Sequence, residues 1–350
     1  MSRSTDRPDF DDLSARPGHQ RRIGIWIAAL AMLAAVSLGT LGLGRYPVSP
    51  HEVLLALLGR QDSPALSVLR MVVIEVRLPR LLAAALVGAA LSVAGASYQT
   101  VFRNPLVSPG LLGVLSGSAF GAALAIVLAA HPLWVQAAAF AGGLTAAAVG
   151  LGIAGALRSG NVLALVLGGL ISDALFSSLL SLVKYVADPQ NQLPAIVYWL
   201  LGSLAQVGWD DLDRFAVPLA LGTGLLCAGG RLLDALSLSD DEARSLGVPV
   251  TALRLAVIAL ATLISALTVS VAGIIGWIGL LVPHMARLLV GAGHRQLLPL
   301  SAVIGAIVLI LADTCARSVS AGEVPLGIVT QLFGALGFAL VLRRLRQDAS

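Results

Sequence analysis

Hydrophobic residues along this chain fall into blocks of about 20, and polar residues gather in the short stretches between the blocks. A helical block of that length crosses the hydrocarbon core of a bilayer, which is about 30 Å thick. The pattern therefore predicts an all-α membrane protein with ten membrane-spanning helices. Their expected ranges are 23–44, 81–100, 110–130, 133–156, 161–186, 214–230, 250–270, 274–291, 297–316 and 326–342.

Two stretches do not fit that description. Residues 1–22 are polar and are predicted to form a disordered cytosolic tail, which leaves residues 23–345 as one transmembrane domain. The apolar run after this tail is too long for a signal-peptide core and lacks a small-residue cleavage site, so we expect it to remain as the first span. Residues 193–208 are apolar but short, which predicts a helix lying at the membrane interface or a partial re-entry into the bilayer.

Composition supports a membrane protein. Of the 350 residues, 57% are hydrophobic and 12% are charged, whereas soluble domains carry about 25% charged residues. The mean hydropathy is +0.89. The two cysteines, Cys227 and Cys315, both fall within predicted spans and match no metal-binding spacing, so they are interpreted as small apolar residues.

The distribution of basic residues predicts the orientation, because arginine and lysine accumulate on the cytosolic side of membrane proteins. Both ends of the chain are rich in arginine, so both are expected in the cytosol, which requires an even number of spans. In this orientation eight of the 23 basic residues lie outside the cytosol. Five of these eight lie in one loop, 45–80, which includes Arg77 and Arg80. These arginines either contact lipid headgroups or bind an acidic partner outside the cytosol.

Several kinds of chemistry have no support in the sequence. A phosphate-binding P-loop needs a lysine after a glycine-rich turn, and the single lysine, Lys184, follows Leu-Val instead. The pair His51-Glu52 lacks the second histidine of a zinc-protease helix, and no nucleophile elbow is present. We therefore expect no enzymatic activity, no metal site, no cofactor on this chain and no nucleic-acid partner.

Ionisable residues within spans are costly and therefore indicate function. Asp173 and Lys184 lie 11 residues apart in the fifth span, which is about three helical turns, so they share a face. That face either lines a water-filled path, or Asp173 bonds a neighbouring helix. Asp313 and Arg317 in the ninth span have the spacing of a local ion pair.

Six sequence motifs together resemble one family, the FecCD-type permease subunits of type II ABC importers, which serve iron–siderophore, haem and cobalamin uptake. Residues 24–345 take part in the resemblance. The motifs are RLPR at 77–80, FRNPLVSPGLLG at 102–113, LSDDEARSLG at 238–247, AGIIGWIGLLVPH at 272–284, LADTCAR at 311–317 and EVPLG at 323–327. The resemblance implies a BtuC-like fold of ten transmembrane helices in a bacterial inner (plasma) membrane.

The resemblance also implies partners on both sides of the membrane. Arg77, Arg80 and Arg317 match the family's arginines that receive glutamates of a periplasmic substrate-binding protein. Residues 231–249 match the coupling helices that contact a cytosolic ABC ATPase, which would hold ATP and Mg²⁺. The residues assigned to that contact are Ser239, Asp240, Asp241, Glu242, Arg244, Leu246 and Gly247. Residues 239–242 have the composition of a capped, acid-rich helix start, and Gly247 suits its end.

Four further residues match the family's cytoplasmic gate: Asn104, Leu106, Gly160 and Asn161. Asn-Pro and Ser-Gly-Asn are turn-forming pairs, so these residues also suit plain loops. The family assembles as a homodimer with two ATPase chains, which places the transport path between two copies, with Asp173 and Lys184 along it.

Two alternatives to an ABC importer stay open at this point. An ATP-independent secondary transporter would use carboxylates near the middle of the membrane, and Asp173 is the clear candidate, so Asp173→Asn would abolish uptake in that case. An intramembrane hydrolase would need a catalytic pair, and the sequence offers none. The cargo of an importer of this class is not specified by the permease sequence.

Overall fold

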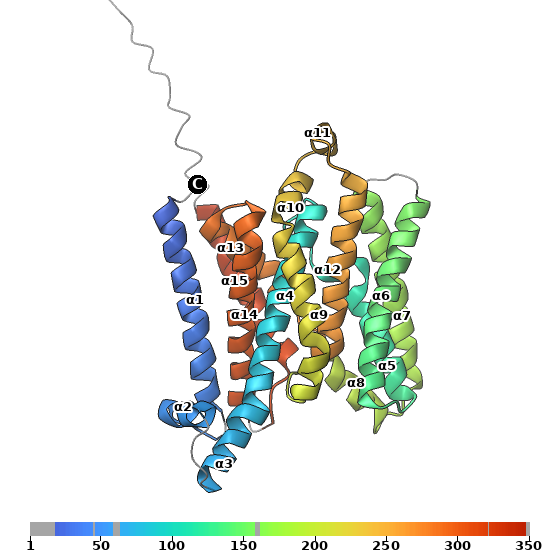
Figure 1. The fold of residues 1–350 in the computed structure, drawn as a ribbon. Coiled ribbons are helices and arrows are strands. Elements are labelled where there is room, and N and C mark those ends of the chain that lie inside the picture. The colour runs from blue at the N-terminus through green and yellow to red at the C-terminus, as the bar shows by residue number, and fades with distance from the viewer. Residues whose placement is uncertain (1–17, 45, 59–63, 158–161, 321, 348–350) are drawn as a thin grey trace, which may run out of the picture.

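A computed structural model describes residues 18–44, 46–58, 64–157, 162–320 and 322–347 of the chain. The fold is 82% helical, and the described residues include no strand (Figure 1). The elements are α1 (His19–Gly42), α2 (Pro50–Leu58), α3 (Pro64–Arg70), the π-helical segment η2 (Met71–Arg77), α4 (Leu78–Val101), the 3₁₀ turn η3 (Pro109–Leu112), α5 (Val114–Val127), α6 (Pro132–Ala156), α7 (Val162–Val186), α8 (Gln192–Leu200), α9 (Trp209–Ala228), α10 (Gly230–Ser237), α11 (Asp240–Ser245), α12 (Val250–Ala272), α13 (Ile278–Val290), α14 (His294–Ser318) and α15 (Leu326–Gln347).

Six helical stretches in the described chain are long and apolar enough to span a membrane. They are α1, residues 67–101 through the end of α4, α6, α7, α12 and α14, and the pair α9 and α10, bent by 55°, makes a seventh if it counts as one span. Three shorter apolar helices, α5, α13 and the first part of α15, coincide with three of the predicted ranges. The chain is therefore a multi-span membrane protein with six or seven long spans, and the count of ten crossings stays a prediction.

The outer surface of the bundle needs a lipid environment. The most apolar window of α1 is only 6% buried although its mean hydropathy is 2.0. Large side chains such as Leu182 on α7 and Leu340 on α15 are more than half exposed as well. A water-soluble protein would not leave apolar surface of this extent uncovered, whereas hydrocarbon solvates it without cost.

The centre of the bundle is α4, which packs against α9, α12, α13 and α14. Glycines bring its backbone into contact with its neighbours. A β-carbon on Gly95 would lie 1.8 Å from the carbonyl oxygen of Gly279 in α13, and one on Gly88 would lie 2.2 Å from that of Gly305 in α14. Such close crossings stabilise helix pairs in lipid, where apolar attraction between helices is weak.

The two ends of the bundle carry different short helices (Figure 1). The α11 end carries α10 and α11, the beginning of α1 and the end of α15, whereas the α2 end carries α2, α3 and α8. Residues 193–208, predicted to lie at the interface or re-enter, contain the nine-residue helix α8, which is too short to span. The helix α1 begins at His19, inside the stretch predicted as a tail, and residues 1–17 lie outside the described residues, so the tail stays a prediction.

Candidate functional site

The helix α11 at the α11 end begins with the cap predicted from the sequence. The Ser239 hydroxyl accepts a hydrogen bond from the backbone N–H of Glu242 (3.3 Å), and the Ser239 backbone N–H donates to the Glu242 carboxylate (2.9 Å). The Ser239 hydroxyl also donates to the Glu242 carboxylate (2.7 Å), and this bond, with that from the backbone N–H of Ser239, lowers the pKa of Glu242. Gly247 adopts a left-handed φ of +78°, which few other residues tolerate, and it ends the turn. The prediction of a capped short helix is therefore confirmed.

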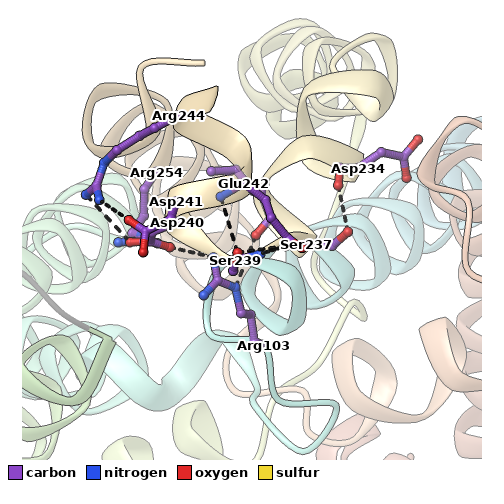
Figure 2. Close-up of polar contacts among 10 residues, drawn as sticks. Arg103, Asp234, Ser237, Ser239, Asp240, Asp241, Glu242, Arg244 and Arg254 are labelled. Carbon is purple, nitrogen blue, oxygen red and sulfur yellow. Dashed lines mark hydrogen bonds and ion pairs between the residues drawn. The ribbon is translucent and has the colours of Figure 1, made fainter. Parts of the chain in front are cut away.

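Asp240, the first residue of α11, is held by two arginines from different elements (Figure 2). Its Oδ1 accepts hydrogen bonds from Arg254 Nη2 of α12 (2.8 Å) and from Arg103 Nη2, just after α4 (2.5 Å). Partial burial by itself would raise the pKa of Asp240. The hydrogen bonds from Arg254 and Arg103, together with their charges, outweigh that effect and lower it. These contacts fix the base of α11 to the bundle.

The opposite face of α11 is open to solvent. The side chain of Asp241 is 97% exposed and that of Arg244 is 57% exposed, and they pair only with acids and bases of the same short helix. Leu246 is 68% exposed. A small helix with a fixed base and an exposed acidic and apolar tip is suited to insertion into a cleft on another protein.

The predicted gate is only partly covered by the structure. Asn104 Oδ1 accepts a hydrogen bond from the backbone N–H of Leu106 (2.9 Å), which shapes the turn after α4, and Leu106 is 60% exposed. Gly160 and Asn161 lie outside the described residues. This turn directly follows Arg103, which binds Asp240 at the base of α11, so the turn and α11 are connected through Arg103.

The three predicted docking arginines lie together at the α2 end, but their guanidinium groups are occupied and buried. Arg77 donates to the carbonyl oxygens of Leu41 (2.6 Å) and Tyr46 (2.5 Å), and it is 6% exposed. Arg317 donates to the carbonyl oxygen of Thr40 (2.7 Å) and is 8% exposed. In the chain by itself these groups turn inward and satisfy backbone carbonyls next to the end of α1, and their role in docking a binding protein stays a prediction.

Arg80 forms the strongest ionic contact of this end. Its Nε and Nη2 donate to the Asp313 carboxylate at 2.9–3.0 Å, and its Nη1 donates to Glu323 at 3.0 Å. Asp313 is buried, whereas the side chain of Glu323 is 29% exposed. The predicted pair within α14, Asp313 with Arg317, is thus replaced by a pair between α14 and α4, in which the planar guanidinium meets the carboxylate in the bidentate geometry it prefers.

Asp173 and Lys184 lie on α7, as predicted, and both are half-buried. Within the ranges that the structure describes, neither side chain forms an ion pair or a hydrogen bond. Leu170, Ser177 and Ser181, which share their face of α7 at helical spacing, are exposed. The face expected to line a path therefore exists as an uncovered surface of this chain, and its role there stays a prediction.

Sequence reasoning missed the internal partners of the charged residues. No motif points to the pairing of Arg103 and Arg254 with Asp240, although an arginine such as Arg254, at the fifth position of an apolar block, signals a partner for its charge. Glu323 had been read only as part of a motif, and nothing in the sequence points to its pairing with Arg80. Among the described residues, no group of three or more His, Cys, Asp or Glu side chains could hold a metal ion.

Comparisons with known proteins agree on one family. A sequence profile of the FecCD transport family matches residues 30–344. The molybdate import permease of Haemophilus influenzae is 39% identical over 335 residues, which cover 95% of this chain and 98% of that protein. The hemin transport permease of Yersinia pestis is 40% identical over 287 residues, covering 79% and 84%. The cobalamin import permease of Halobacterium salinarum is 39% identical over 275 residues, covering 78% and 74%.

A solved structure has the same fold over nearly the whole chain. It is described as an inward-facing conformation of a metal-chelate type ABC transporter, and it is similar with a TM-score of 0.83 at 38% identity. The match covers 92% of this chain and 99% of that one.

Proposed function

Because this chain belongs to the FecCD transport family, we propose that it is the membrane-spanning permease subunit of an ABC importer in a bacterial inner membrane, with both termini in the cytosol. The α11 end would then face the cytosol and the α2 end the outside. The observation that supports this proposal best is α11 itself, a capped acidic helix with a fixed base and an exposed tip. Hydrolysis of ATP belongs to a separate ATPase chain, since this sequence contains no P-loop.

The working importer would be a homodimer of this chain with two ATPase chains at the α11 end and a soluble binding protein at the α2 end. Binding of ATP would draw the ATPases together and shift α11, and the shift would exchange outward and inward openings of a path between the two copies. The uncovered face of α7, with Asp173 and Lys184, is the part of the described chain that suits the wall of such a path. Differential affinity of ATP for the two states would supply the work.

The cargo we propose is a metal chelate of the iron–siderophore, haem or cobalamin type. Three relatives are named for molybdate, hemin and cobalamin, so an oxyanion is the second candidate class. The binding protein that delivers the cargo would set most of the selection among these classes.

Co-purification with the ATPase tests the proposal. The double substitution Asp241→Arg with Leu246→Asp alters the exposed tip of α11 and leaves the cap and the contacts of Asp240 intact. We expect it to weaken retention of the ATPase on the tagged permease by about 100-fold, because a like charge and a buried charge in an interface each cost several kcal/mol. The control is Asp210→Arg, an exposed position at the start of α9 at the other end.

Full retention of the ATPase by the double variant would contradict the assignment of α11. Absence of any ATPase on the wild-type chain, together with uptake that persists without ATP, would instead favour the secondary transporter that uses Asp173.

A further inference from the structure

A cavity of about 320 Å³ opens at the α11 end, beside the end of α10. Its walls come from the turn after α4, the end of α10, the last turns of α13 and the start of α14. This size is at the lower limit of small-ligand sites in proteins. The role proposed above uses two wall residues, Asn104 and Arg103, and leaves the cavity itself unexplained.

The charges on the cavity wall are all basic. Arg103 and Arg287 contribute guanidinium groups, His284 and His294 contribute imidazoles, and none of the lining residues is acidic. Two of these groups are already engaged: Arg103 binds Asp240, and His294 lies between Asp234 (2.6 Å to Nδ1) and Thr100 (2.6 Å to Nε2). The basic groups that remain available to bind a ligand are therefore Arg287 and His284 of α13.

Arg287 and His284 lie three residues apart on α13 and so share one face of that helix. Within the described chain Arg287 has no carboxylate partner and no hydrogen bond, although it is half-buried. His284, which also lines the cavity, has a buried Nε2 without a hydrogen-bond partner among the described residues. A buried polar group without a partner is rare and costly, so its position beside the unpaired Arg287 indicates that a polar ligand completes the cavity.

We propose that this cavity binds a tetrahedral oxyanion, a phosphate group in free form or on the headgroup of an anionic lipid. The planar guanidinium of Arg287 would take two of its oxygens, and His284 Nε2, carrying the proton, would donate to a third. Asn104 on the facing wall is a further donor. The inference rests on the geometry of α13 and the cavity and does not depend on the import function proposed above.

The test is oxyanion binding by the purified full chain with its partners in lipid nanodiscs. In discs of phosphatidylcholine, titration calorimetry with inorganic phosphate measures binding of the free anion to the protein. In discs that also contain phosphatidic acid, native mass spectrometry reports a retained lipid. We expect saturable binding in one arm, weakened by about tenfold or more in Arg287→Gln and by several-fold in His284→Gln, as for the loss of a charge-assisted hydrogen bond.

Arg295→Gln is the matched control, since it removes an exposed arginine at the same end and outside the cavity. Arg287→Lys keeps the charge without the bidentate geometry and should bind more weakly than wild type, which covers the case in which Arg287→Gln fails to fold. Absence of binding in both arms, or an equal loss in Arg295→Gln, overturns the proposal.

Discussion

At the scale of single residues, two aspartates in this protein bind arginines in very different surroundings. Asp240 is partly exposed and joins α11 to Arg103 and Arg254, whereas Asp313 is buried and joins α14 to Arg80. The buried pair costs more desolvation, so it is weak evidence of net stabilisation. In the Asp240 cluster the carboxylate is only partly buried and receives two charge-assisted hydrogen bonds, so this cluster is the clearer stabilising contact.

Asp240→Asn should loosen α11 without unfolding the protein. The amide keeps one weak acceptor and loses the charge that binds two guanidiniums, at a cost of about 2 kcal/mol in local opening. Hydrogen exchange of the α11 backbone should accelerate by about 30-fold. The adjacent Asp241→Asn, which removes only a surface pair with Arg244, should change it by less than about threefold. Equal acceleration in the two variants would refute the anchoring role of Asp240.

Acid should have the same effect as Asp240→Asn, because folding lowers the pKa of Asp240. The stabilisation from this cluster is fully present above the usual aspartate pKa of about 4, and it is lost as the pH falls through the lower folded value.

At the scale of elements, glycine decides how closely helices approach. α4 meets α13 at Gly95 and Gly279 and meets α14 at Gly88 and Gly305, and at both crossings a β-carbon would lie closer than 2.5 Å to backbone atoms. Relief of such an overlap requires the helices to move apart, because backbone atoms cannot rotate away as a flexible side chain can.

Gly95→Ala should therefore destabilise the bundle by roughly 2–3 kcal/mol, within the range of overpacking in cores. Gly152→Ala in α6 is the control, because nothing lies within 4 Å of its added methyl group. That variant should be neutral or stabilising by about 0.5–1 kcal/mol, since alanine favours a helix. Thermal unfolding in detergent measures both, and equal midpoints would contradict the packing described here.

Local pattern was enough to predict most elements. Each predicted span overlaps an apolar helix, because a run of about 20 apolar residues has few alternatives to a helix in lipid. The cap formed by Ser239 and Glu242 was also predictable, because it depends on two residues that are three apart in the sequence. The interior partners of Arg77, Arg80 and Arg317 could not be read in this way. Glu323 lies 243 residues from Arg80 along the chain, so only tertiary packing brings them together.

At the scale of the whole molecule, the acidic α11 and the arginine cluster of Arg77, Arg80 and Arg317 lie at opposite ends of the bundle (Figure 1). This separation is what an importer with one partner on each side of the membrane requires. Docking at the arginine end is a proposal that the pairing of Arg80 makes more specific. Asp313 holds Arg80 from the interior, and Glu323 holds it at the rim, where a carboxylate of a docked protein would replace it.

Glu323→Gln should then strengthen docking of the binding protein by about three- to tenfold, because the substitution removes the anion that competes for Arg80. Biolayer interferometry on the assembled importer measures the affinity. Glu75→Gln is the control, since Glu75 is exposed on the neighbouring η2 and makes no contact with Arg80. An affinity reduced by Glu323→Gln as strongly as by Arg80→Ala would indicate that Glu323 itself positions Arg80, and the exchange of carboxylates would be wrong.

One continuous helix, α4, connects the two surfaces that we propose bind partners. Arg80 is the third residue of α4, and Arg103 follows two residues after its last turn, so about 1.5 Å per residue places the two ionic anchors roughly 35 Å apart. Whatever tilts or slides this helix at Arg80 must also displace Arg103, and with it the base of α11. A movement of α4 caused by a docked binding protein would then reach the ATPase on the other side of the membrane without intermediate contacts, because this one helix extends to both ends.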